Sequence, residues 1–293
     1  MGDRMRVAAE VNVLHAPARS CGLGGRRRLL LGLLVCVLAL GIVFVAGRVL
    51  WDASVATDFA AKNLSPCLNH PFGTDQMGRD VLACTISGLS TSLLIGALVS
   101  MCTGVIALVL ALFAVCGGRV ADTFVIWLCD LMTGVPHIVL LILVSYALGR
   151  GFWGVTAALA LTHWPSLTRV LRVELMQLVS SPHMKMSAAL GAGGFWGILP
   201  HAVPAVIPQL VMGMVLAFPH AILHESSLTF LGFGLPLDVP AVGSILAEAM
   251  GYLTAGMWWQ AFLPGLSLVA CVLLIDCVGR ALRGVLSART AQR

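Results

Sequence analysis

The sequence predicts an all-α integral membrane protein with six transmembrane helices. Of its 293 residues, 59% are hydrophobic and only 11% are charged, and the mean hydropathy is +0.95. A soluble domain has about 25% charged residues. Several apolar runs reach or approach the roughly 20 residues that a helix needs to cross a bilayer. Because these runs are long and show little period-2 alternation, we expect helices and not a barrel.

The apolar runs divide the chain into spans and connections. We expect spans at about residues 29–50, 90–116, 122–148, 153–173, 203–231 and 258–278. The corresponding segments are a cytoplasmic N-terminal segment (1–28), a first anchor (29–50), an extracytoplasmic loop (51–89), a transmembrane core (90–279) and a cytoplasmic tail (280–293). The first apolar run is too long for a signal peptide, so we interpret it as an uncleaved anchor.

The positive charges predict the orientation of these spans. With the N-terminus inside, only Arg48, Lys62, Arg79 and Arg150 fall outside, and the other 14 of the 18 lysines and arginines are cytoplasmic. We therefore expect an N-in, C-in orientation. The polar insert between the fourth and fifth spans then faces the cytoplasm.

Composition and motifs exclude several other classes of protein. The net charge is +5, but the positive residues gather at helix ends and in the tails and form no basic stripe interleaved with aromatics, so no nucleic-acid partner is expected. The nine cysteines include no CxxC pair and no zinc-type spacing. Neither of the two lysines, Lys62 and Lys185, follows the glycine pattern of a phosphate-binding loop. We expect no directly bound cofactor, and any ATP must be used by other subunits.

The polar, glycine-rich segment 182–208 is the most informative part of the chain. It reads PHMKMSAALGAGGFWGILPHAVPAVIP and separates two strongly apolar stretches. The glycines favour a bend between two short helices. We expect either a hairpin that docks onto a soluble motor protein or an interfacial loop that lies at the lipid headgroups.

This segment resembles the cytoplasmic coupling loop, or EAA loop, of the permease subunits of ABC importers of the peptide/nickel type. The residues expected to couple to an ATPase are Lys185, Ala188, Ala189, Leu190, Gly191, His201 and Pro204. Leu190, Gly191, His201, Pro204 and Pro208 match the family pattern position for position. Lys185 stands where the family has its glutamate, and Met186 and Ser187 stand where it has two alanines.

A second segment, His70–Asp80, resembles the HPFGTDxxGRD signature before the second helix of the C-type subunit in the same family. Its signature residues are Gly73, Thr74, Asp75, Gly78, Arg79 and Asp80. Asp75 and Arg79 are spaced to pair across one helical turn, and Thr74 or Asp75 is placed to cap a short helix. We expect this segment to shape the outer vestibule, the alternative being contact with a substrate-binding protein.

A third resemblance covers LHESSLTFLGFGL, residues 223–235. Glu225, Phe230, Leu231, Gly232 and Gly234 fit the family pattern of an acidic residue followed by Ser/Thr-Phe-Leu-Gly-x-Gly. Together the three resemblances extend from about residue 70 towards the C-terminus.

Ionisable residues in the predicted spans are the candidates for a translocation path, because such residues usually face a cavity or each other. They are Asp130, His137, His163, His220, His224, Glu225 and Asp276. From these we select Asp130, His220, His224 and Glu225 as the path. We expect Asp130 to make an interhelical contact, Glu225 to serve architecture or gating, and the sequence His163-Trp164-Pro165 to break its helix locally, with a kink as the default explanation.

His220 and His224 are four residues apart and therefore share one helix face, with Glu225 beside them. Imidazole and carboxylate groups suit a transition metal. The two histidines are therefore candidate metal ligands, and the alternative is ordinary hydrogen bonding between helices. The family usually lacks histidines at these two places, which indicates a specialised cargo such as nickel or a metal–metallophore complex.

The resemblance implies a function and a set of partners. The chain is expected to be a multi-pass permease subunit of the bacterial cytoplasmic (inner) membrane and not an enzyme. It would form half of the path for a peptide, nickel or a metal chelate and couple to ATP hydrolysis through the loop 182–204. The implied partners are a second permease in a heterodimer, two ATP-binding subunits, an extracytoplasmic substrate-binding protein and the lipid bilayer.

Two functions from other classes stay open. One is a secondary transporter driven by protons through Asp130 or Glu225, although such transporters often contain inverted repeats and none is visible here. The other is an intramembrane metalloenzyme that uses His220, His224 and Glu225. Dependence on a co-purifying ATPase separates both from the permease.

Overall fold

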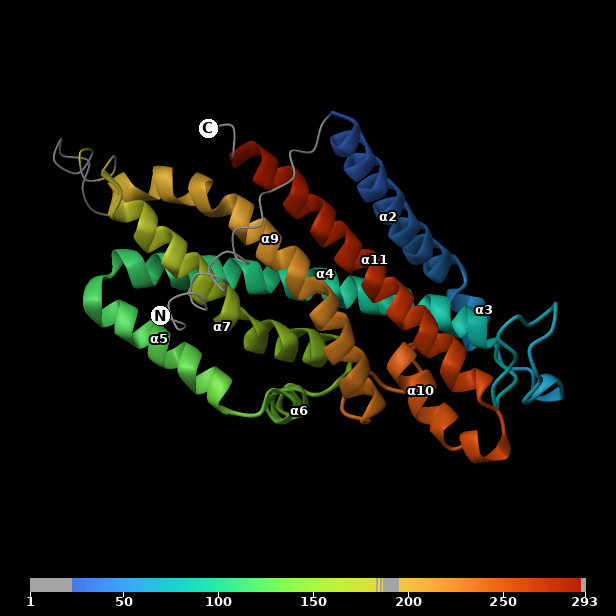
Figure 1. Ribbon diagram of the computed structural model, residues 1–293. Helices are drawn as coiled ribbons and strands as arrows, with labels where there is room; N and C mark the ends of the chain where they lie inside the picture. Colours follow the sequence, from blue (N-terminus) through green and yellow to red (C-terminus); the bar gives the residue numbers. More distant parts are fainter. Residues whose placement is uncertain (1–22, 183, 185, 187–194, 291–293) are drawn as a thin grey trace, which may run out of the picture.

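The computed structural model describes residues 23–182, 184, 186 and 195–290. In this part of the chain the regular elements are helices, so the predicted all-α fold is confirmed (Figure 1). The helices are α2 (Leu23–Val49), α3 (Trp51–Val55), α4 (Val81–Cys116), α5 (Gly118–Gly134), α6 (His137–Ala147), α7 (Gly151–Val179), α9 (Phe195–Phe230), α10 (Val242–Met250) and α11 (Trp259–Thr290). Two short 3-10 helices, η1 (Phe59–Ala61) and η2 (Leu253–Ala255), lie in the connections.

Four of the described helices, α2, α4, α9 and α11, are long and apolar enough to cross a membrane, and α5 with α6 makes a fifth if the bent pair is one span. Helix α7 has the length of a span, but it carries Arg169, Arg172 and Glu174 in its C-terminal half. The six-span count and the N-in, C-in orientation therefore stay predictions. The C-terminal end of α7, the N-terminal end of α9 and the C-terminal end of α11 lie towards one end of the molecule, and residues 56–80 lie at the other (Figure 1).

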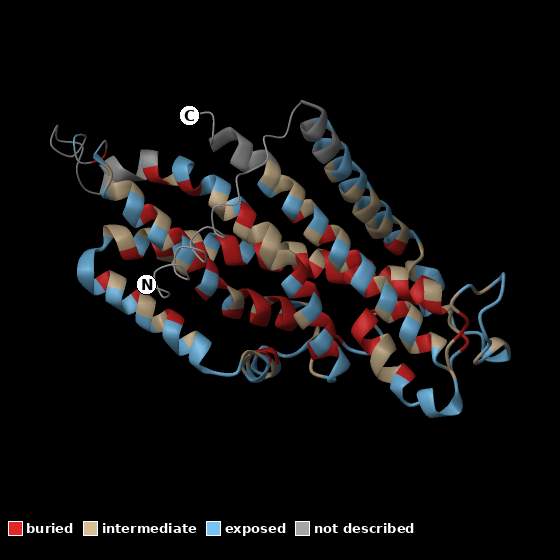
Figure 2. Ribbon diagram, in the orientation of Figure 1, coloured by how far each residue is buried: buried red, intermediate tan, exposed pale blue. Residues whose placement is uncertain are grey.

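Helix α4 forms the centre of the bundle. It packs against α7, α9 and α2, and much of it is buried (Figure 2). Its buried face is rich in small residues. Small side chains let helix backbones approach closely, which is how helices associate in a membrane. Three apolar clusters surround this helix: one joins α4 to α5, α7 and α9, a second joins it to α6, α7 and α9, and a third joins it to α2 and α11.

Gly88 lies where α4 closely approaches the backbone of α10, because a Cβ atom there would lie 2.8 Å from the backbone nitrogen of Val242. We expect Gly88→Val to lower the free energy of unfolding by about 2 kcal/mol, because backbone cannot yield as a side chain does. Thermal unfolding of the purified protein in detergent measures this cost. The control is Gly41→Val, where an added Cβ meets nothing within 4 Å. Equal melting temperatures for the two variants would contradict the packing described.

The structure corrects several predicted helix bounds. Helix α4 begins at Val81 and not at about Ser90, because Asp80 caps it and its early hydroxyls bond within the helix, as Thr85 does to the Val81 carbonyl at 2.6 Å. Helix α9 begins at Phe195 and not at about Val203, so the predicted second half of the hairpin is continuous with the following span. Helix α11 continues to Thr290, through most of the predicted cytoplasmic tail.

The predicted span 122–148 is two helices, α5 and α6, which meet at an angle of 96°. Val135 and Pro136 are extended between them. Proline has no N–H and disfavours the helical conformation in the residue before it, which explains the break.

The sequence His163-Trp164-Pro165 does not interrupt α7, which is continuous through Pro165, so the predicted kink would lie within one helix. Pro165 leaves the Leu161 carbonyl without its helical donor. The indole nitrogen of Trp164 replaces that donor, at 2.8 Å from the Leu161 oxygen. The residue before the proline thus satisfies the carbonyl that the proline leaves free.

Helix α5 is tied to α7 by ion pairs. Both guanidinium contacts of Arg172 go to the Asp122 carboxylate, one of them at 2.6 Å. Arg169 lies 2.7 Å from Asp130, which places the predicted interhelical contact of Asp130 between α5 and α7. These pairs fix the wall that α5 and α7 contribute to the cavity described next.

Candidate functional site

A cavity of about 1500 Å³ lies between the helices. Helices α7 and α9 supply most of its lining, and α4, α5, α6 and α11 contribute single residues. Ligand sites commonly measure about 300–1,000 Å³, so this space is large enough for an extended polar molecule. Four histidines of the described residues line it: His137, His163, His220 and His224.

The four predicted path residues fall in three different places. His220 and His224 line the cavity. Asp130 is largely exposed, with 65% of its side chain accessible, and pairs with Arg169, which also donates to Thr133 of the cavity lining at 3.3 Å. Glu225 is fully buried between α9 and α4.

Glu225 accepts three hydroxyl hydrogen bonds in this interface. Ser92 of α4 donates at 2.6 Å, Thr229 at 3.0 Å and Ser226 at 3.3 Å. The Thr229 hydroxyl also accepts from the amide of Leu235, at 3.2 Å. The carboxylate therefore joins α4 and α9 and anchors the loop that follows α9.

We expect Glu225→Leu to lower the free energy of unfolding by about 2 kcal/mol, because it leaves buried hydroxyl donors without their acceptor. Glu225→Gln keeps one acceptor oxygen in the same place, so its cost should be clearly smaller. Thermal unfolding in detergent compares the two variants. Equal stability would contradict the bracing role of Glu225.

The segment His70–Asp80 forms a compact turn and not a helix. Thr74 pairs with Asp80 across it, and Gly73 and Gly78 both have φ of 74°, which favours glycine. The Asp75 carboxylate accepts from the amides of Met77 at 2.8 Å and of Arg79 at 2.9 Å. The predicted pairing of Asp75 and Arg79 is present at 2.5 Å, although it spans this turn and not a turn of helix.

The residue that caps a helix also differs from the prediction. Asp80, not Thr74 or Asp75, caps the helix that follows, because its carboxylate accepts from the amides of Leu82 at 2.8 Å and Ala83 at 3.1 Å. Its other oxygen lies 2.8 Å from His70. Thr74 instead holds the loop, donating to the Ala61 carbonyl at 2.5 Å and accepting from the Leu64 amide at 2.9 Å.

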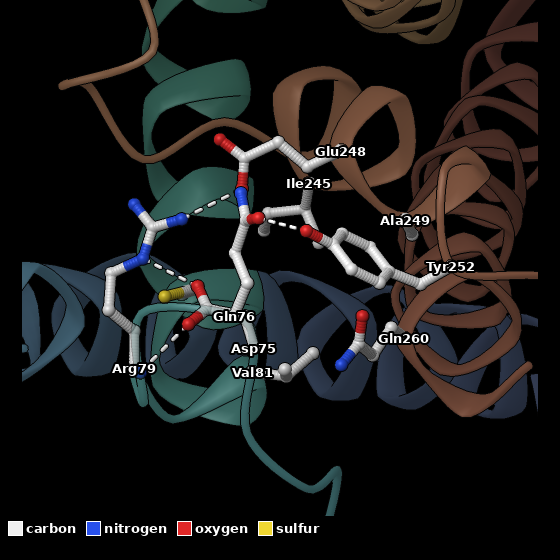
Figure 3. A pocket seen from close by; sticks show the side chains of 10 residues that line it. Asp75, Gln76, Arg79, Val81, Ile245, Glu248, Ala249, Tyr252 and Gln260 are labelled. Atoms are coloured by element: carbon white, nitrogen blue, oxygen red, sulfur yellow. Dashed lines mark hydrogen bonds and ion pairs between the residues drawn. The ribbon is translucent and has the colours of Figure 1, made fainter. Parts of the chain in front are cut away.

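Figure 3 shows how the turn is joined to α10. Arg79 bridges two carboxylates: its Nε lies 2.5 Å from Asp75 and its terminal nitrogen 2.8 Å from Glu248. Beside it, Tyr252 donates to Gln76, and Gln260 donates to the Thr74 carbonyl at 2.9 Å. A cavity of about 20 Å³, room for about one water molecule, lies among these groups.

Sequence reasoning missed the partners of the turn. Glu248 is the only acidic residue of α10 and lies in an otherwise apolar helix, a signal that would have identified it. Tyr252 and Gln260 carry no comparable pattern. Burial raises the pKa of the Glu248 carboxyl above its ordinary value, although Arg79 opposes this effect.

Most of the predicted coupling residues lie outside the described residues: Lys185, Ala188, Ala189, Leu190 and Gly191. Of the other two, His201 falls within α9, and Pro204 falls in the same helix and lines the cavity. The role of these residues therefore stays a prediction.

The predicted pairing of His220 with His224 as metal ligands is not the grouping that the fold produces. His224 lies with His137 and His163, and the ligand nitrogens of these three are all within 4.8 Å of one another. Their separation along the chain hides this grouping from sequence reasoning. His220 lines the same cavity outside that group.

The chain is an all-helical membrane protein with a large cavity among its helices, an architecture that suits a transport protein. Residues 104–292 match the family described as the inner membrane component of binding-protein-dependent transport systems. The chain belongs to this family and is a permease subunit, not an enzyme, with several membrane-crossing helices in the inner membrane.

Three relatives illustrate the range of similarity. A protein of Brucella suis biovar 1 named as a peptide permease is 33% identical over 233 residues, which cover 79% of this chain and 77% of the relative. The dipeptide transport system permease protein of Bacillus subtilis strain 168 is 29% identical over 265 residues, 89% of this chain and 82% of the relative. A second Brucella suis protein, named for peptide transport, is 29% identical over 264 residues, 90% of this chain and 88% of the relative.

Proposed function

We propose that this chain is one of two membrane subunits of an ATP-driven importer and forms half of the translocation path for peptides. The observation that carries the proposal is the cavity of about 1500 Å³, lined largely by α7 and α9, in a chain of the permease family. The names of relatives from Brucella and Bacillus, which specify peptide or dipeptide transport, support the cargo class.

In this proposal the chain supplies the translocation path and a segment that transmits movement from the ATP-binding subunits. It carries out no covalent chemistry. ATP binding and hydrolysis take place in two partner subunits, because this sequence contains no phosphate-binding loop. The movement of these subunits is transmitted to the loop 182–204, which follows α7 and leads into α9. These two helices supply most of the lining of the cavity. Their displacement opens the cavity alternately to the two sides of the membrane, a shift between two states. A second permease completes the path, and a substrate-binding protein delivers the cargo from outside.

The proposal also assigns the two ends of the bundle to the two sides of the membrane. The turn His70–Asp80 and α10 form one bonded unit at the end of the bundle away from the C-terminal end of α7 and the N-terminal end of α9. With the loop in the cytoplasm, this unit lies on the outer face. The ion pair and hydrogen bonds within this unit support a structural role in the outer vestibule. Its position at the outer end of the bundle makes it part of the surface next to the binding protein.

Nickel or a metal chelate is a second candidate cargo. The observation that favours it is the meeting of His137, His163 and His224 on the cavity wall, since imidazole is a good ligand for nickel. A peptide can itself carry a bound metal ion, so the two cargo classes share chemistry.

Uptake measurements on the assembled importer decide between these cargoes. The complex is reconstituted in vesicles with its binding protein, and ATP-dependent uptake is compared for a labelled dipeptide, radioactive nickel and a nickel chelate. We expect dipeptide uptake that stops when ATP is omitted. Uptake of nickel or its chelate with no uptake of peptide would overturn the peptide proposal.

A further inference from the structure

Three histidines from three helices meet on the wall of the large cavity. His137 begins α6, His163 lies in the middle of α7, and His224 lies near the end of α9. The ring centres are 4.7 Å apart for His137–His163, 4.7 Å for His137–His224 and 5.2 Å for His163–His224. All three residues are partly buried, and each offers one nitrogen within 4.8 Å of the others.

The hydrogen bonding of His163 leaves one nitrogen free to bind a ligand. Its Nδ1 donates to the Leu159 carbonyl at 2.8 Å, because a carbonyl oxygen can only accept. In the neutral ring the proton is then on Nδ1, and Nε2 carries a lone pair. This Nε2 is buried and has no hydrogen-bond partner in the described structure. A backbone carbonyl that holds the other nitrogen of the ring is the usual support of a metal-binding histidine.

Packing of aromatic rings alone does not account for this arrangement. A buried acceptor without a donor is unfavourable, because it has lost its hydrogen bonds to water and gained none in the protein. A cation shared with the two neighbouring rings would remove that cost. Nitrogens that bind one ion tetrahedrally at about 2.0–2.1 Å are about 3.3 Å apart. The three nitrogens are already within 4.8 Å, so small side-chain rotations bring them to that separation.

We propose that His137, His163 and His224 bind one divalent transition-metal ion on the cavity wall. Three imidazole nitrogens select a borderline ion such as Ni²⁺, Cu²⁺, Zn²⁺ or Co²⁺, and they disfavour Mg²⁺ and Ca²⁺. Because all three residues line the cavity, the remaining coordination positions face its interior. Three protein nitrogens with an open position form a site that can exchange its ion or hold a ligand on it. The bound ion is either the cargo itself or part of a chelate that is the cargo. This role in transport rests on the proposed function, whereas the metal binding does not.

The binding is tested on the assembled complex, purified through a tag that contains no histidine and stripped of metal. Ni²⁺ is titrated with calorimetry, and bound Co²⁺ is followed by its visible absorption. The variants are His163→Gln and His137→Gln. The matched control is His220→Gln, which removes an imidazole from the same cavity outside the cluster. The melting temperature of each variant shows whether it is folded.

We expect one high-affinity ion for each copy of this chain. Each cluster variant should weaken Ni²⁺ binding by about 100-fold or more, since loss of even an outer-shell partner costs about 10–100-fold. His220→Gln should bind as the wild type does. Undiminished binding in both folded cluster variants, or an equal loss in His220→Gln, would overturn the assignment.

The transport readout separates this inference from the proposed function. A complex that imports dipeptide but binds no metal at the cluster overturns the metal site and leaves the peptide importer. A complex that binds the ion but imports nothing with ATP supports the site and contradicts the importer. If the ion is cargo, free Ni²⁺ uptake falls in His163→Gln; if it belongs to a chelate, only chelate uptake falls.

Discussion

Replacing Arg79 with methionine is expected to lower the free energy of unfolding by about 3 kcal/mol, because removing one member of a buried ion pair leaves charges without a partner. The Arg79 side chain is only 16% exposed, and Asp75 and Glu248 are 15% and 20% exposed. Thermal unfolding of the purified protein in detergent measures the loss. Lys62→Met is the control, since it removes a cation from an exposed position in the same loop.

Two further variants test the geometry of this bridge. Arg79→Lys should recover only part of the stability, because an ammonium group cannot reproduce the two directions in which the guanidinium reaches Asp75 and Glu248. Glu248→Gln should cost less than Arg79→Met, since Arg79 keeps Asp75. An Arg79→Met variant as stable as Lys62→Met would show that the bridge contributes nothing.

The pH dependence of Arg79→Met follows from Glu248. Burial raises the pKa of Glu248 and Arg79 lowers it, so removing Arg79 raises this pKa further. A carboxyl with a raised folded-state pKa contributes stability below its ordinary pKa, and this contribution is lost as the pH rises through the folded-state pKa. The penalty of Arg79→Met should therefore be smaller at about pH 5 than at about pH 8.

Replacing Leu190 with aspartate is expected to reduce ATP-dependent uptake by about tenfold or more, the effect of losing about 1.4 kcal/mol at one contact with the motor. The expectation rests on the resemblance of the segment 182–204 to a coupling loop. Leu237→Asp is the control, because it makes the same substitution at an exposed position in the loop between α9 and α10. Uptake and ATP hydrolysis are measured on the same reconstituted complexes.

The pattern of losses distinguishes coupling from folding. Leu190→Asp should assemble normally and melt at the wild-type temperature but fail to transport. Normal uptake in both Leu190→Asp and Leu237→Asp would contradict the proposed coupling role of the segment 182–204. Loss of uptake in Leu237→Asp alone would place the sensitive contact on the opposite end of the molecule.

The sequence was sufficient for the class of fold because composition and apolar runs are properties of neighbouring residues. It placed most long helices near their observed positions but missed bounds that depend on single contacts. The early start of α4 depends on Asp80 as its cap, and the continuity of α7 through Pro165 depends on the indole of Trp164. Neither contact follows from hydropathy.

The site was less predictable because its residues come from distant parts of the chain. The spacing of His220 and His224 gave a reason to pair them, yet His224 lies with His137 and His163 because α6, α7 and α9 converge there. Glu225 was expected to serve architecture or gating, but its partner Ser92 lies on α4 and was not identifiable from spacing. Pairings between helices require the packing of the helices, which one sequence does not supply.

ATP-dependent uptake of a labelled dipeptide tests the central claim most directly. The complex containing this chain is reconstituted in vesicles, with ATP supplied on the side of the ATP-binding subunits. The account predicts uptake that requires ATP and those subunits and is unaffected by a proton gradient. Uptake by this chain without the ATP-binding subunits, driven by a proton gradient alone, would contradict it and identify a secondary transporter.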